Sequence, residues 1–221
     1  MKQCLAATML SLFLLISGCQ SNSACCEADK KIDLFNGRDL TGWTLYVPDD
    51  TVDVATIWSV QDGVIHCTGA TNGYMRTNKS YADYHLHLEW RWAAEPANSG
   101  VLLHIHGEDK LWPICIENQL WSGNAGDLVL INWTGITVDG EDKADPNTQY
   151  VVIPKQQPSS EKPAGQWNCY DIVCDGGTIT STVNGVLQNS GTRASVTSGP
   201  IGLQSEGGPI EFRNITLTPL R

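Results

Sequence analysis

The sequence predicts an all-β protein, a β-sandwich or jelly roll formed by a single domain. The 221-residue chain has short runs in which apolar and polar residues alternate, separated by Gly, Pro, Asn and Asp, and it has no helical stripe of useful length. Its 21 Gly and 8 Trp fit strands and turns better than helices. Hydrophobic residues make up 41% of the chain, which is enough for one core.

The amino terminus is predicted to be a lipoprotein signal peptide, residues 1–18. A positive residue precedes an apolar stretch at 5–16, which is shorter than a membrane span. The string Leu-Ile-Ser-Gly-Cys that ends this stretch resembles a bacterial lipobox, in which Cys19 becomes the lipidated first residue. An ordinary secretory signal is the alternative. We expect a polar tether at 19–31, a domain at 32–221, and an exported lipoprotein in the outer membrane, periplasmic or at the cell surface.

Charge and cysteine content narrow the possible partners. The formal net charge of -10 argues against nucleic acid, whose phosphates require clustered Lys and Arg. No apolar run of about 20 residues interrupts the body, so we expect membrane contact only through the lipid anchor. No Cys-x-x-Cys or histidine-rich spacing indicates a structural zinc site. Spacing does not reveal the pairing of the four body cysteines, and free buried thiols are expected for at least two of Cys67, Cys115, Cys169 and Cys174.

The strands follow from turn signals and alternation, taken in order along the chain. Asp62-Gly63 predicts the turn of a hairpin over residues 58–67, and Asn184-Gly185 predicts a second turn. Residues 84–92 alternate most regularly, with Leu and Trp on the core face and His, Glu and Arg on the other. Residues 139–164 are polar and Pro-rich, so we expect a long loop there. Further strands are expected at 101–106, 114–121, 169–174, 178–183, 201–204 and 210–217.

Three strands in succession are expected to lie side by side and to share a polar face, which would form the floor of a cleft. The residues assigned to this face are Glu89 and Arg91, then His104 and His106, then Cys115, Glu117, Gln119 and Trp121. Alternate positions, including Val101, Leu103, Ile105 and Ile116, would line the core. The alternative is a solvent-exposed polar face without a functional role, because antiparallel sheets often have one face in contact with water. The mixture of residue types and the indole of Trp121 favour a site that binds sugar.

The residues around Glu117 disfavour conventional glycoside hydrolysis. Retaining enzymes need two carboxyl groups about 5–5.5 Å apart. Glucanases with jelly-roll folds carry a Glu-x-Asp-x-x-Glu pattern, whereas this chain has Gln119 in place of the middle acid and no second Glu. Glu89 remains a possible partner for Glu117.

Eight segments in order, covering about residues 32–220, resemble the 3-keto-disaccharide hydrolase family (DUF1080). They are LFNGRDLTGW at 34–43, WSVQDG at 58–63, YADY at 81–84 leading to LEWR at 88–91, NSGV at 98–101, IENQL at 116–120, KPAGQWN at 162–168, GPIGLQ at 199–204 and FRNI at 212–215. The resemblance implies a concanavalin-like jelly roll. It also implies 3-keto-glucoside 1,2-lyase and 3-keto-2-hydroxyglucal hydratase activities. Gln166 departs from the Glu that is common in this family, so we give it no catalytic role.

The chemistry implied by this resemblance requires few groups. A ketone at sugar carbon 3 acidifies the hydrogen on carbon 2, and the aglycone on carbon 1 is then β to the carbonyl. Elimination needs a base, a group that stabilises the enolate oxygen, and a proton donor. We predict Glu117 as the base, Arg91 or His104 as the stabilising group and His104 as the acid, with Glu89 also in the catalytic group.

The substrate-binding prediction adds groups that orient and stack on the sugar. Gln119 and Asn98 would orient hydroxyls, Trp121 and Trp167 would stack on sugar faces, and Lys162 lies at the end of the predicted loop. Each of these residues could instead have a purely structural role. The alternatives are a cross-strand hydrogen bond for His104, a core position for Trp167, a turn role for Asn98 and a solvated charge for Lys162. No cofactor is assigned, although His104, His106 and Glu117 could hold a divalent metal. A non-catalytic carbohydrate-binding module and a conventional glycosidase are the alternative functions.

Overall fold

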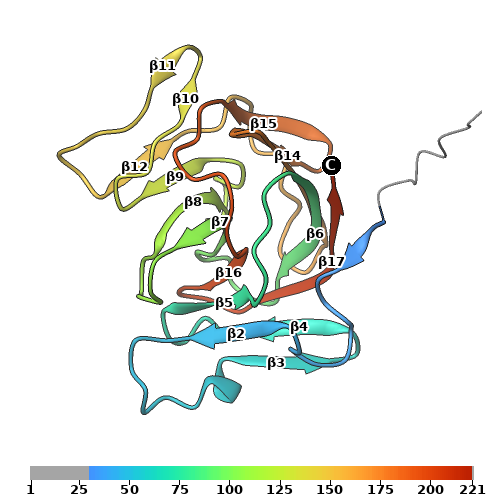
Figure 1. Ribbon diagram of the computed structural model, residues 1–221. Helices are drawn as coiled ribbons and strands as arrows, with labels where there is room; N and C mark the ends of the chain where they lie inside the picture. The colour runs from blue at the N-terminus through green and yellow to red at the C-terminus, as the bar shows by residue number, and fades with distance from the viewer. Residues whose placement is uncertain (1–29, 221) are drawn as a thin grey trace, which may run out of the picture.

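The computed structural model describes residues 30–220, which form two antiparallel β-sheets packed face to face (Figure 1). The predicted signal peptide, Cys19 and nearly all of the predicted tether lie outside the described residues. Within the described range, no helix is both long and apolar enough to span a bilayer. The only helical turn in this range is a 3-10 helix at Val54–Thr56, so the all-β prediction is confirmed.

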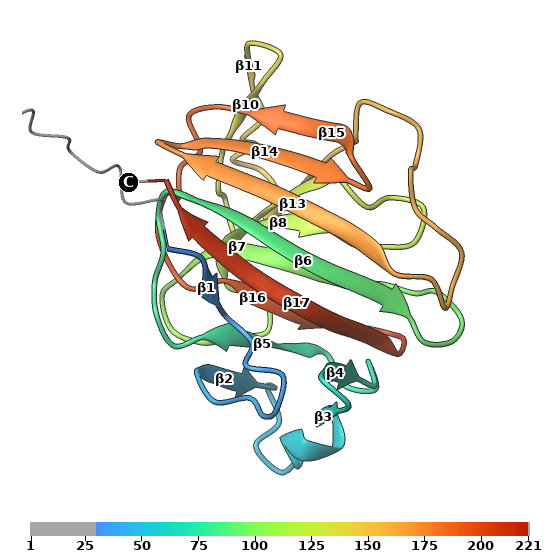
Figure 2. The same ribbon diagram turned by 90° about the vertical axis from the view of Figure 1, so that its right-hand side faces the viewer.

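Sheet A is the larger of the two. Its strands are β1 (Ile32–Asp33), β3 (Trp58–Gln61), β4 (Val64–Cys67), β6 (Tyr84–Trp92), β13 (Asn168–Asp175), β14 (Thr178–Val183), β15 (Val186–Gly191) and β17 (Ile210–Pro219). Their spatial order is β15-β14-β13-β6-β17-β4-β3, with β1 added beside β17. Figure 2 shows these strands in front of the second sheet.

Sheet B lies behind sheet A in Figure 2. Its strands are β2 (Trp43–Tyr46), β5 (Gly73–Thr77), β7 (Gly100–His106), β8 (Ile114–Gln119), β9 (Leu128–Ile131), β12 (Tyr150–Ile153) and β16 (Gly202–Ser205). The spatial order is β12-β9-β8-β7-β16-β5-β2. A separate short hairpin pairs β10 (Thr137–Val138) with β11 (Glu141–Asp142).

The core lies between the two sheets, as the alternation predicts. Every second residue of β6, including Leu86, Leu88 and Trp90, is buried in it, and the intervening residues are partly exposed on the outer face of sheet A. Sheet B contributes Val101, Leu103, Ile116 and others to the same core. A smaller apolar cluster lies on the outer face of sheet B, the face turned away from sheet A.

Turn chemistry fixes the predicted hairpins. Asp62 and Gly63 both have positive φ, 51° and 77°, as do Asn184 and Gly185, 49° and 81°. Two successive left-handed residues form a type I′ turn, whose twist matches that of the flanking strands. Both predicted hairpins are therefore confirmed.

Two sequence-based expectations about the fold are wrong. Strands β6 and β7 are consecutive but lie in different sheets, since β6 pairs with β13 and β17 while β7 pairs with β8 and β16. The segment that joins them crosses from one sheet to the other. The long loop expected at 139–164 also contains strands, because β12 pairs with β9 at the edge of sheet B.

The four body cysteines are free thiols. Cys67, Cys115 and Cys174 are buried, whereas Cys169 is partly exposed on the outer face of sheet A. The expectation of at least two free buried thiols is therefore confirmed.

Candidate functional site

The candidate site lies on the outer face of sheet B, centred on Gly100 in β7. Residues paired across antiparallel strands point to the same face, and Gly100 pairs with Gln119 while Leu102 pairs with Glu117. Gln204 in β16 follows the Leu203–Val101 pair and so lies on the other side of Gly100. Three neighbouring strands therefore bring polar side chains around a position that has no side chain of its own.

Glu117 occupies the space that a side chain at Gly100 would fill. A Cβ atom placed on Gly100 would lie 1.9 Å from Oε1 of Glu117, so any larger residue would displace the carboxyl group. Glu117 is only 4% exposed, and its Oε1 has no hydrogen-bond partner among the described residues. Burial, together with the smaller effect of the nearby carboxyl group of Glu206, raises the pKa of Glu117 from 4.5 to about 8.

Glu206 provides a second carboxyl group at the same place. It lies two residues beyond Gln204 and bridges to Asn98, which precedes β7 by two residues. The pKa of Glu206 is raised by burial, and a hydrogen bond from the Asn98 side chain, which lowers the pKa, only partly offsets this. Because two neighbouring carboxyl groups disfavour double ionisation, this pair tends to hold one proton in the neutral pH range.

Unpaired oxygen atoms distinguish this cluster from an ordinary polar surface. In the part of the chain that the structure describes, the side-chain oxygens of Asn98, Glu117 and Gln204 are buried without a hydrogen-bond partner. Gln204 is only 2% exposed. Buried acceptors are normally satisfied, and leaving one unpaired costs about 1–3 kcal/mol. Three such oxygens in one cluster are acceptors that hydroxyl groups of a ligand could use.

Other groups on this face are held in place by their own contacts. Oε1 of Gln119 accepts from the backbone N–H groups of Leu120 and Trp121, at 2.9 and 2.8 Å, which leaves its amide nitrogen to donate. Asp109 accepts a hydrogen bond from the Tyr74 hydroxyl at 2.8 Å and two from Arg76, at 2.7 and 2.8 Å. The segment that carries Asp109 therefore packs against one side of the outer face of sheet B.

The structure separates Glu89 and Arg91 from Glu117. Both lie on the outer face of sheet A, where Glu89 accepts from Arg213 and Asn214 and Arg91 donates to Glu211. The expectation that they share a polar face with Glu117 is wrong, because β6 belongs to the opposite sheet. Glu89 consequently cannot partner Glu117 in a two-carboxylate mechanism.

Trp167 and Lys162 also lie away from Glu117. The guanidinium carbons of Arg91 and Arg213 lie 4.5 and 4.0 Å from the centre of the Trp167 ring, so the indole is packed against two cations. Lys162 donates from Nζ to the Trp167 backbone carbonyl at 2.8 Å. Neither side chain is placed to contact a sugar that is bound at Glu117.

His104 is turned away from the outer face of sheet B. Its φ of 55° lies in a bulge where the register between β7 and β8 shifts, and this reverses the alternation. The ring packs edge-on against Tyr84, 5.6 Å between centroids, and Nδ1 lies 3.1 Å from the Val196 carbonyl oxygen. Burial lowers the pKa of His104. The geometry contradicts both the predicted acid role beside Glu117 and a metal site formed by His104, His106 and Glu117.

Of the predicted site residues, the structure brings together Glu117, Gln119 and Asn98. Trp121 lies just beyond the end of β8 with 56% of its surface exposed. The sequence analysis missed Gly100, Gln204 and Glu206. Alternation along β16 places Gln204 and Glu206 on one face, and this was the available signal for them. Nothing in the sequence showed that β16 lies next to β7.

The two sheets and their topology define a concanavalin-like jelly roll, the fold of several carbohydrate-active proteins. A crystallised protein of Parabacteroides distasonis ATCC 8503, provisionally assigned as a glycosyl hydrolase, matches with a TM-score of 0.63 and 22% identity over 86% of this chain and 94% of its own. The carbohydrate-binding module CBM66 from Bacillus subtilis matches at 0.56 and 10%, over 80% and 96% of the two chains. A Bacillus licheniformis β-glucanase matches at 0.56 and 14%, over 85% and 96%.

Residues 30–218 match the family described as the 3-keto-alpha-glucoside-1,2-lyase-like domain, and the chain belongs to this family. No curated protein matches the chain in sequence. The resemblance drawn from the eight sequence segments is therefore confirmed, as is the fold that it implied.

Proposed function

We propose that the protein cleaves 3-keto-glycosides by proton abstraction at carbon 2, elimination of the aglycone and hydration of the resulting enone. The observation that carries this proposal is the Glu117–Glu206 pair near the unpaired buried oxygens of Asn98 and Gln204 on the outer face of sheet B. Membership of the 3-keto-alpha-glucoside-1,2-lyase-like family supports the substrate class.

Glu117 is the proposed base. A general base works best when its pKa lies near the operating pH, and the pKa of Glu117 is raised to about 8. Its unpaired Oε1 is the atom that would accept the proton from carbon 2. The C–H electron pair then forms the enolate, and collapse of the enolate expels the aglycone oxygen from carbon 1.

Glu206 is the proposed proton donor, in the place that the sequence analysis gave to His104. Because the two carboxyl groups disfavour simultaneous ionisation, one is protonated while the other is ionised. The protonated group gives its proton to the departing aglycone oxygen. In the hydration step the roles reverse, since one group takes a proton from water as oxygen adds to carbon 1 and the other protonates carbon 2.

The amides around the pair would bind the sugar. The unpaired oxygens of Asn98 and Gln204 can accept from sugar hydroxyls, and the amide nitrogen of Gln119 can donate to the enolate oxygen. An unoxidised glycoside is the second candidate substrate, because Glu117 and Glu206 are themselves two neighbouring carboxyl groups.

The decisive experiment is a product assay on 3-keto-trehalose, 3-keto-sucrose and an aryl 3-keto-glucoside. We expect Glu117→Gln to reduce aglycone release at least about 100-fold, which corresponds to about 2.7 kcal/mol. Glu211→Gln is the matched control, since Glu211 is also buried, at 7% exposure, but lies in sheet A. Near-normal turnover by Glu117→Gln would remove it from the role of base.

Two further measurements separate the alternatives. Incorporation of solvent deuterium at carbon 2 is expected for elimination and hydration, and its absence would indicate direct displacement. Turnover of the unoxidised glycoside at a similar rate would favour the conventional glycosidase, whereas binding of both sugars without turnover would indicate a non-catalytic module. Parallel assays with a chelator test whether turnover requires a divalent metal.

We also propose that the protein is exported and anchored through a lipid on Cys19. Support comes only from the sequence of residues 1–19, with its positive residue, its apolar stretch and the lipobox-like string that ends at Cys19. Metabolic labelling with a radioactive fatty acid tests this directly: wild type should incorporate label and Cys19→Ser should not. Equal labelling of the two would exclude the anchor.

A further inference from the structure

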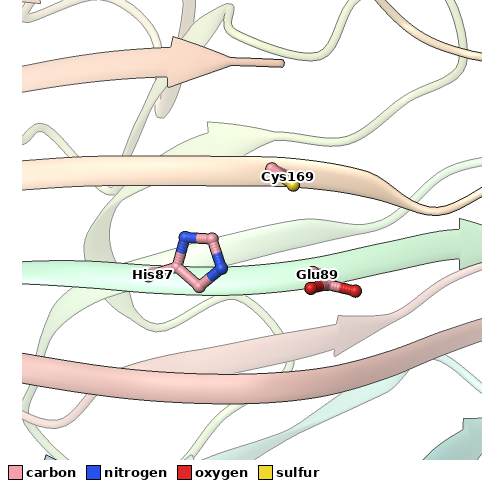
Figure 3. A group of neighbouring side chains, drawn as sticks. All are labelled: His87, Glu89 and Cys169. Carbon is pink, nitrogen blue, oxygen red and sulfur yellow. The ribbon is translucent and has the colours of Figure 1, made fainter. Parts of the chain in front are cut away.

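A second cluster of reactive side chains lies on the outer face of sheet A, separate from Glu117. His87 and Glu89 project from β6 and Cys169 projects from β13 (Figure 3). One ligand atom from each lies within 4.8 Å of the others. Imidazole, carboxylate and thiolate are the three side-chain groups that bind zinc in proteins.

The geometry of the two strands explains why these groups meet. His87 and Glu89 are two apart on one strand, so both point to the same face. Cys169 pairs directly with Glu89 in the ladder and therefore shares that face. Ligand atoms around tetrahedral zinc lie about 3.5 Å apart, so modest side-chain rotations bring the three groups to bonding distance.

Asp171 supplies an outer contact of the kind that zinc-binding histidines use. It pairs with His87 in the ladder, and its Oδ1 lies 2.8 Å from Nδ1 of His87. A hydrogen bond at Nδ1 orients the ring and leaves Nε2 to bind the metal. The same Oδ1 lies 2.9 Å from Nε2 of His85, which flanks the cluster without being a member of it.

The charge balance suits a divalent ion. Glu89 accepts from Arg213 at 2.6 Å and from Asn214 at 2.8 Å, one bond on each oxygen. Each carboxylate oxygen has two lone pairs, so one remains for a metal. The negative charges of Glu89, Asp171 and a Cys169 thiolate balance Arg213 and the divalent ion, so the loaded cluster carries no net charge.

We propose that His87, Glu89 and Cys169 form a site for a divalent transition metal, with zinc the preferred ion. Binding replaces the Cys169 S–H bond with a sulfur–metal bond and releases the proton to solvent. Three protein ligands leave a fourth position open. A cavity of about 370 Å³ adjoins the site, lined by His87, Asn214 and Lys31 among others, so a small ligand can reach that position.

The signal for this site is absent from sequence spacing. Its ligands come from two strands that are about 80 residues apart along the chain, and two of them are separated by a single residue. Zinc motifs recognised in sequence instead place two ligands within one short loop or helix turn. The site also does not depend on the proposed function, because Glu117 lies on the other sheet.

The test uses the full chain in reduced form, titrated with zinc against a chromogenic chelator and with cobalt as a spectroscopic probe. We expect a tight zinc site in the wild type and a thiolate-to-cobalt charge-transfer band. Cys169→Ser should abolish that band, and both Cys169→Ser and His87→Asn should weaken zinc binding at least about 100-fold. Asp171→Asn should weaken it about 10-fold to 100-fold.

His85→Asn is the matched control, since His85 contacts the same Asp171 oxygen but is not a ligand. It should leave zinc affinity within about threefold of wild type. Every protein compared, including the reference, carries Cys25→Ser and Cys26→Ser, because these adjacent thiols could bind zinc or cobalt themselves. Wild-type affinity in both Cys169→Ser and His87→Asn, or an absence of zinc binding by wild type, would overturn the proposal. Near-ultraviolet circular dichroism confirms folding of each variant.

Discussion

The two outer faces of the sandwich differ in how their charged side chains are paired. On sheet A, carboxylates are paired with arginine or histidine side chains: Glu89 is bound to Arg213, Glu211 to Arg91 and His66, and Asp171 to two histidines. On sheet B, Glu117 is more deeply buried than any of these and has an oxygen without a partner. The carboxylates of sheet A are therefore neutralised by their neighbours, whereas the buried carboxyl group of sheet B keeps a free acceptor.

The comparison shows that residue type alone is a weak guide to a site. Glu89 and Arg91 lie on the strand with the most regular alternation, yet they pair with neighbours on a partly exposed face. Glu117 is distinguished by burial and by a missing partner, and neither property is visible in sequence. A buried carboxyl group with a raised pKa is costly to the fold, which is a common feature of functional sites.

The largest expected effect follows from Gly100→Ala. The added Cβ would lie 1.9 Å from Oε1 of Glu117, so the carboxyl group must move from its present position. We expect turnover of 3-keto-glycosides to fall at least about 100-fold, because misplaced catalytic groups lose most of their effect. When Gly100→Ala is added to Glu117→Gln, turnover should fall little further, since the carboxyl group that Gly100→Ala displaces is already absent. A full additional 100-fold loss there would show that Gly100 acts independently of Glu117.

The second prediction concerns the dependence of stability on pH. The pKa of Glu117 is raised from 4.5 to about 8 in the folded protein, so between these values the folded state keeps a proton that the unfolded state loses. Stability therefore falls as pH rises through this window, by at most about 1.4 kcal/mol per pH unit. Glu117→Gln should remove this pH-dependent loss. In urea unfolding, the free energy of unfolding of the variant relative to wild type should therefore increase from about pH 5 to about pH 8.

Glu89→Gln is the opposite case on the other sheet. Burial raises the pKa of Glu89, but hydrogen bonds from Asn214 and Arg213 outweigh this and lower it overall. The stability that this group contributes is present above its unfolded pKa and is lost as pH falls. Wild type should therefore keep a constant advantage over Glu89→Gln across the window in which Glu117→Gln gains. Parallel trends for the two variants would contradict the assigned pKa shifts.

Trp167→Leu should have a smaller effect, on stability only. Its ring packs against the guanidinium groups of Arg91 and Arg213, and cation–π contacts of partly exposed groups contribute about 0.5–1 kcal/mol each. We expect a loss of about 1–2 kcal/mol in urea unfolding, with kcat and KM within about threefold of wild type. A large rise in KM with unchanged stability would restore the sugar-stacking role that the sequence suggested.

The smallest effect is expected from Arg213→Met. Arg213 is about one-third exposed, and its bond to Glu89 is an ion pair at the surface. Such pairs contribute about 0–1 kcal/mol and are screened by salt. The ion-pair part of the difference in unfolding free energy should therefore be below about 1 kcal/mol and should shrink in high salt, whereas loss of the cation–π contact with Trp167 adds about 0.5–1 kcal/mol that depends less on salt. A difference that is larger and insensitive to salt would show that the pair is effectively buried.

Local features of the fold could be predicted because they depend on neighbours in sequence. The alternation of residues 84–92 matches β6, and the turns at Asp62-Gly63 and Asn184-Gly185 are present as expected. Strand β12 was missed because its four residues lie within a polar segment and pair at a sheet edge. His104 was assigned to the wrong face because one left-handed residue in a bulge reverses alternation.

The sequence by itself determined the all-β class, which residues of each strand face the core, and the family to which the chain belongs. These depend on periodicity, turn residues and short motifs, all of which are local, and the assignment of core-facing residues failed where the bulge at His104 reverses the alternation of β7. Only the tertiary structure decided which strands are neighbours. Pairing in a sandwich is set by how the whole chain crosses between sheets, so it placed Glu206 beside Glu117, removed Glu89 to the opposite face, and brought Cys169 to His87.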